Sequence, residues 1–147
     1  MGTATTDAQG HFTYQVAPGP NRTVLVGYRH DAFQVARSIR YYAHVRPTIK
    51  ITPGRVGFGG EIKIRGRLPV ARSAGRVVIL QAASLHSDVW NTFDRATTNK
   101  RGVHHSSYVF DATSSNTTYP IRAEVPRQNR LPWESGHSRP ALVEVRG

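Results

Sequence analysis

The sequence predicts an all-β protein, an immunoglobulin-like β-sandwich preceded by a partial β-sandwich unit. Apolar and polar residues alternate with a period of two along much of the chain, as in Glu61–Leu68, and this is the pattern of half-buried strands. Glycine and proline, 13 and 9 of the 147 residues, interrupt every stretch that could carry a helical period. The chain therefore reads as short strands separated by turns.

A turn motif that occurs twice supports the same fold class. Thr6–Gly10 precedes the alternating stretch 11–16, and Thr98–Gly102 precedes the alternating stretch 103–110. In each copy an Asp or Asn side chain can accept a hydrogen bond from the backbone two residues on, and the glycine supplies a positive φ. Each motif is expected to start a hairpin. The two copies lie 92 positions apart, which is close to the length of one sandwich domain.

Proline marks the expected boundary between two units. Residues 45–47 end a long alternating stretch, and proline cannot join a central ladder. We therefore expect residues 1–46 to form the C-terminal part of one sandwich and residues 47–147 to form a second one. The first unit should contain strands at 12–16, 23–29 and 35–45. The second should contain about seven strands, near 48–52, 61–68, 76–82, 89–96, 103–110, 119–125 and 141–145.

Aromatic side chains should fill the space between the two sheets, because they bury the most area per residue. The expected core residues are Trp90, Phe93, Tyr108, Phe110, Tyr119, Phe58 and Ile64.

Composition excludes some chemistry and favours one class of partner. The chain has no cysteine, so it has no disulfide, no thiolate zinc site and no cysteine nucleophile. Its formal net charge is +11 and its pI is about 11.1, and such a surface attracts polyanions. Residues 1–5 lack the features of a signal peptide, and no apolar run is long enough to span a membrane. A secreted location would require a longer parent protein, and a natural start at Met1 would favour the cytoplasm.

No catalytic, cofactor or metal site is expected. Ser106 and Ser107 lie close to His104 and His105 in sequence, but neighbours on a strand point to opposite faces. The same alternation gives the His104–His105 pair the wrong spacing for a shared metal site. Lys50 and Lys63 alternate with isoleucines, so they should face water and not form an internal Lys–Asn isopeptide bond.

One stretch interleaves basic and aromatic residues in the way that polyanion-binding surfaces do. It contains Arg37, Arg40, Tyr42, His44 and Arg46. These residues could contact a nucleic acid strand or an acidic glycan. Alternatively, they could form an edge strand whose charge prevents aggregation. Trp133, in a long loop beside Glu134, is a further candidate for glycan contact.

The arrangement resembles tandem immunoglobulin-like domains of secreted and surface proteins from high-GC actinobacteria. Thr6–Tyr14 is similar to the turn and strand of carboxypeptidase-regulatory-like sandwiches. In the second unit, the similarity to these immunoglobulin-like modules covers the opening strands at 49–53 and 64–68, the stretches 78–82 and 90–93, and the penultimate strand 119–126. The resemblance covers nearly the whole chain. It departs from the family in two respects, because the first unit lacks its opening strands and Asn99 stands where the turn usually has an acid.

The resemblance implies a non-catalytic spacer, stalk or adhesion module of a secreted or cell-surface protein. Its binding partner would be a protein or a cell-wall glycan. The alternative is a binder of polyanions or carbohydrate through a basic and aromatic surface. Because the first unit is incomplete, we also expect self-association through it, or completion of its fold by another chain.

Overall fold

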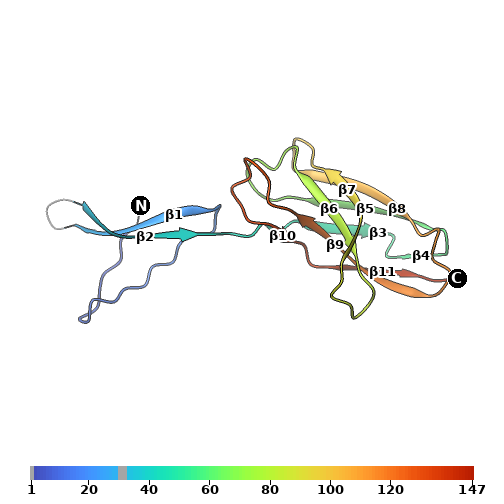
Figure 1. Ribbon diagram of the computed structural model, residues 1–147, viewed down its shortest axis with the longest axis horizontal. Helices are drawn as coiled ribbons and strands as arrows, with labels where there is room; N and C mark the ends of the chain where they lie inside the picture. The colour runs from blue at the N-terminus through green and yellow to red at the C-terminus, as the bar shows by residue number, and fades with distance from the viewer. Residues whose placement is uncertain (1, 30–32) are drawn as a thin grey trace.

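The computed structural model describes residues 2–29 and 33–147, which contain eleven β-strands and no helix. The described chain thus has no helix that could cross a membrane. Figure 1 shows a β-sandwich with a two-stranded hairpin that extends from one of its ends. The C-terminus lies at the opposite end of the sandwich. The expected all-β class is confirmed.

The N-terminal hairpin consists of β1 (Arg22–Arg29) and β2 (Phe33–Tyr41), paired antiparallel. The expected strand at 12–16 does not form, and β2 ends at Tyr41 and not at residue 45. No residue among 2–28 and 34–44 is buried. The hairpin therefore has no core of its own, although a two-stranded sheet is only marginally stable by itself in water.

The sandwich consists of two sheets. The smaller one has the order β3 (Thr48–Thr52), β5 (Glu61–Arg67), β8 (Val103–Val109), with all pairs antiparallel. The larger one has the order β4 (Arg55–Val56), β11 (Ala141–Val145), β9 (Thr117–Val125), β6 (Val77–Ala82), β7 (Asn91–Thr97), and β10 (Gly136–His137) also pairs with β9. Strand β4 pairs parallel with β11, and the other pairs in this sheet are antiparallel.

The core lies between the sheets and follows from the period of two. Strand β5 alternates exposed and buried residues over its whole length, so Ile62 and Ile64 face inward. They meet aliphatic side chains of the larger sheet, namely Val78, Leu80, Ile121, Ala123, Val125, Val143 and Val145. All of these residues are at most 1% exposed.

Four of the expected aromatic residues form a chain that links the two sheets. The ring centroids of Phe93 and Tyr108 are 5.0 Å apart, those of Tyr108 and Phe110 are 5.1 Å apart, and those of Phe110 and Tyr119 are 5.5 Å apart. Ile64 is also buried, as expected.

Two other aromatic predictions were wrong. Phe58 is 44% exposed, because it lies in the turn after β4 and not on a strand face. Trp90 precedes β7, and its ring lies 4.1 Å from the guanidinium carbon of Arg122 and outside the core cluster.

Both copies of the turn motif adopt the predicted local structure. Asp7 accepts backbone hydrogen bonds from Gln9 and His11, and Asn99 accepts them from Arg101 and Val103. The glycines at 10 and 102 have φ values of 81° and 73°. Neither turn starts a sheet hairpin, however. Residues 11–16 are not a strand, and the second turn connects β7 of one sheet to β8 of the other.

The base of the hairpin is attached to the sandwich through Asn21. Its side-chain amide donates to Glu134 Oε1 at 2.7 Å, and its side-chain oxygen accepts from the backbone N–H of Ala43 at 2.7 Å. The Glu134 backbone continues this contact by donating to Ala43 and accepting from Val45. Val45 is only 1% exposed, so the chain enters the sandwich through a packed junction.

Candidate functional site

The basic and aromatic residues at positions 37–46 do not form one surface. Arg37 pairs with Val26 and Arg40 with Thr23, and the odd separation of three positions along β2 places the two arginines on opposite faces of the hairpin. Tyr42 is exposed just beyond the end of β2. The basic and aromatic residues at positions 37–46 are therefore contiguous in sequence but lie on different faces of the structure.

The remaining predicted contact residues lie at the junction. His44 forms an isolated bridge with Glu134, and its Nδ1 is 2.6 Å from the carbonyl oxygen of Ser135. Arg46 is exposed. Trp133 is partly buried and packs against the core, so its ring anchors the loop and is not freely presented.

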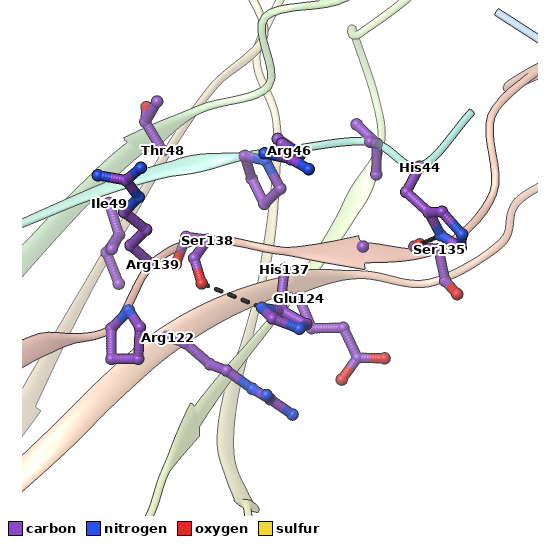
Figure 2. A pocket seen from close by; sticks show the side chains of 14 residues that line it. His44, Arg46, Thr48, Ile49, Arg122, Glu124, Ser135, His137, Ser138 and Arg139 are labelled. Atoms are coloured by element: carbon purple, nitrogen blue, oxygen red, sulfur yellow. Dashed lines mark hydrogen bonds between the residues drawn. The ribbon is translucent and has the colours of Figure 1, made fainter.

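A groove of about 1000 Å³ lies at this junction. It is lined by residues 44–49, by Arg122 and Glu124 of β9, and by residues 135–140. Figure 2 shows that the side chain of Arg122 extends away from Arg46 and Arg139. Arg122 is also engaged elsewhere, since its Nε donates to Gln81 and its guanidinium stacks on Trp90. The charges of the groove therefore do not converge on a single ligand position.

A group of positive charges lies on the outer face of the smaller sheet. There Lys50 of β3 lies directly opposite Arg65 of β5, which lies opposite His105 of β8. Lys63 and Arg67 flank Arg65 along β5, and all five side chains are exposed. We call this surface the basic face and define it by Lys50, Lys63, Arg65, Arg67 and His105.

The other exposed positions of this outer surface are mostly polar, namely Thr48, Thr52 and Ser107. Glu61 is the one acid, and it lies at a corner opposite the exposed Val109. A depression of about 650 Å³ lies over the centre of this surface. No Phe, Tyr or Trp side chain points outward from these three strands.

Four cations of the basic face have no internal partner, unlike some arginines of the sandwich. Among residues 2–29 and 33–147, no carboxylate lies within ion-pair distance of Lys50, Lys63, Arg65 or Arg67, and their side chains make no hydrogen bond within the protein. By contrast, Arg55 and Arg146 both pair with Glu144, at 2.7 and 3.2 Å.

His104 lies directly beneath the basic face. It is fully buried opposite Gly66 on β5, and neither ring nitrogen has a hydrogen-bond partner in suitable geometry. Burial lowers the pKa of His104 below its ordinary value of 6.5, and His105 lowers the pKa further, whereas the nearby Thr48 carbonyl acts weakly in the opposite direction. His104 is therefore neutral at physiological pH.

The hydroxyl, histidine and acid groups near His104 are not arranged for nucleophilic catalysis. Ser106 donates its hydroxyl hydrogen bond to the carboxylate of Asp94, whereas a nucleophile would have to donate to a histidine. Within the described part of the chain, no three His, Asp or Glu side chains gather in a way that could hold a metal ion.

The hairpin and the segment before it expose apolar side chains, on both faces of the β1–β2 sheet, since Leu25 pairs with Ser38 and Ile39 with Val24. Seven of the thirteen large apolar residues that are exposed in the described chain lie between positions 12 and 42: Phe12, Tyr14, Leu25, Tyr28, Val35, Ile39 and Tyr42. Both edges of the β1–β2 sheet are unpaired within residues 2–29 and 33–147. The edges of the hairpin therefore offer the free backbone groups of a strand-pairing site.

No protein-family model matches the chain, and no curated protein matches it. The two surfaces must therefore be interpreted from their own chemistry.

Sequence reasoning placed Lys50 and Lys63 outward correctly, and their outward position argues against an isopeptide bond as expected. It missed that they share a surface with Arg65 and His105. The alternation of residues 61–68 predicts that the basic residues of this strand face outward. Only the pairing register of β3, β5 and β8 shows that Lys50 and His105 lie beside Arg65.

Proposed function

We propose that the chain is a non-catalytic structural and interaction module, in which the sandwich is the rigid part and the β1–β2 hairpin pairs with the hairpin of a second copy. The single observation that carries this proposal is the lack of any buried residue among 2–28 and 34–44. A two-stranded sheet needs a further strand or a covering layer to become stable, and a second copy supplies both.

The residues of β2 are compatible with pairing to themselves. In an antiparallel pair of two β2 strands centred on Ile39, Arg37 would lie opposite Tyr41 and Ser38 opposite Arg40. No arginine would then face another arginine. The hairpin already contains an analogous pair, because the Arg22 guanidinium carbon lies 5.1 Å from the ring centroid of Tyr41 on the opposite strand. Such a contact contributes about 0.5–1 kcal/mol at an exposed site.

The first prediction tests this assembly by sedimentation equilibrium at high protein concentration. Wild-type protein should show a reversible monomer–dimer equilibrium. Ile39→Lys should shift the equilibrium to the monomer, because it places two like charges at the centre of the paired strands.

Leu142→Lys is the matched control, since Leu142 is 58% exposed on the sandwich and Ile39 is 48% exposed on the hairpin. This variant should dimerise as the wild type does. A wild-type protein that stays monomeric, or equal behaviour of the two variants, would contradict the proposal.

A further inference from the structure

We infer that the basic face binds a linear acidic polysaccharide. This inference does not depend on the hairpin, because the face belongs to β3, β5 and β8 of the sandwich. It also differs from the surface at positions 37–46 that the sequence pattern indicates.

The first step of the argument is the arrangement of charge. Lys50, Arg65 and His105 form a row across three adjacent strands, which are spaced about 4.8 Å apart. Lys63, Arg65 and Arg67 form a second row along β5, with about 6.6 Å between successive residues. The two rows cross at Arg65, so the cations cover an area and do not surround a point. Such an array suits a polymer with repeated negative charges better than a single anion.

The second step is the missing internal partner. Cationic side chains directly opposite one another destabilise a sheet. Elsewhere in the sandwich some arginines are engaged, Arg55 and Arg146 by Glu144, Arg76 by backbone carbonyls and Arg122 by Trp90. Others in the described chain, such as Arg95 and Arg127, have no such contact but do not lie directly opposite another cation. Lys50, Lys63, Arg65 and Arg67 have no such contact within the described chain. A bound polyanion would remove the repulsion between them.

The third step is the choice between polyanions. Single-stranded nucleic acid is held by large aromatic rings on which its bases stack, and no Phe, Tyr or Trp side chain points outward from these strands. The neutral polar groups beside the cations are instead the hydroxyls of Thr48, Thr52 and Ser107. Hydroxyls can exchange hydrogen bonds with sugar hydroxyls, and arginine can bind sulfate or carboxylate groups with two N–H donors. The chemistry of the face therefore favours an acidic sugar polymer.

The second prediction measures the binding of a fluorescent heparin oligosaccharide by polarisation. Four engaged cations predict that affinity falls roughly 50-fold between about 50 and 200 mM salt. The double variant Lys63→Gln/Arg65→Gln should bind at least about 10-fold more weakly and lose about 1.4 units of the salt slope, which is about half of it. Its melting temperature should not fall below that of the wild type, which shows that the loss is not due to unfolding.

The matched control is Arg37→Gln/Arg40→Gln, which removes the same charge from the hairpin and should keep wild-type affinity. The basic face is not the site if this control loses affinity as much as the first double variant, or if wild-type protein does not bind heparin at about 50 mM salt. Tighter binding of oligo-dT than of heparin of equal charge would overturn the assignment to a polysaccharide. The readout is independent of dimerisation, because Ile39→Lys should bind heparin oligosaccharide as the wild type does.

Discussion

Within the described chain, His104 is the one residue whose buried side-chain polar atoms lack hydrogen-bond partners. Its two ring nitrogens are buried without hydrogen-bond partners. A buried polar group left unpaired costs about 1–3 kcal/mol. The space around the ring is fixed from the other side by Gly66, where an added Cβ would lie 2.2 Å from His104 Nε2 and 2.2 Å from the Thr48 carbonyl oxygen. Glycine at 66 is therefore required by the histidine and the backbone that it contacts.

The third prediction concerns the pH dependence of stability. The pKa of His104 is lowered in the folded protein, so below about pH 6.5 the unfolded chain binds a proton that the folded chain resists. The free energy of unfolding should fall as the pH decreases through this range. His104→Leu should remove this part of the decrease without loss of stability at neutral pH, as measured by thermal unfolding between about pH 7.5 and 5.

The control for this prediction is His105→Gln, which changes the exposed neighbour and should keep most of the decrease. Equal pH profiles for wild type and His104→Leu would assign the effect to other groups.

At the scale of elements, the same turn structure occurs at two places that differ in how much of the fold depends on them. Asp7 and Asn99 each accept two backbone hydrogen bonds in the same pattern. The turn at Asn99 connects the two sheets of the sandwich, and the Gly102 that follows it is buried. The turn at Asp7 lies in an exposed segment that contains no strand.

The fourth prediction compares Asn99→Ala with Asp7→Ala. Loss of the Asn99 hydrogen bonds should lower the free energy of unfolding by about 1–2 kcal/mol, because the sandwich depends on that connection. Asp7→Ala removes the same bonds and should leave the main unfolding transition unchanged. Differential scanning calorimetry compares the two variants directly, and equal shifts would show that turn chemistry alone determines the cost.

The strands from residue 48 onward were predictable because the alternation of residues coincided with strands that have partners. Thr48–Thr52 and Ala141–Val145 form at the predicted positions. The same alternation at Phe12, Tyr14 and Val16 failed, because a strand also needs a neighbour to receive its backbone hydrogen bonds and none is available there. Strand β10 was missed because two residues that include Gly136 carry no periodic signal.

At the scale of the whole molecule, the candidate site depends on information that one strand cannot contain. Residues 37–46 look like a surface because they are contiguous in sequence, yet successive residues of a strand face opposite sides. The basic face combines residues from β3, β5 and β8, up to 55 positions apart between Lys50 and His105. Only the pairing register brings them together. The immunoglobulin-like assignment and the secreted or surface location remain predictions.

The fifth prediction uses salt to separate the two proposed contacts of the molecule. Each chain carries a formal charge of +11, and added salt screens the repulsion between two copies. Dimerisation through the hairpin should therefore strengthen between about 0.05 and 0.5 M NaCl, while heparin binding weakens. Sedimentation and polarisation in the same buffer series measure both. A common direction of change would mean that one surface serves both interactions.

The strict in-and-out order of β5 means that charge and core can change separately. Positions 63, 65 and 67 are exposed on the outer face, while positions 62, 64 and 66 are fixed by the aliphatic residues and the imidazole beneath them. Selection or engineering can therefore alter the charge of the outer face without repacking the interior. A library confined to the three outward positions should yield folded variants with different carbohydrate preferences.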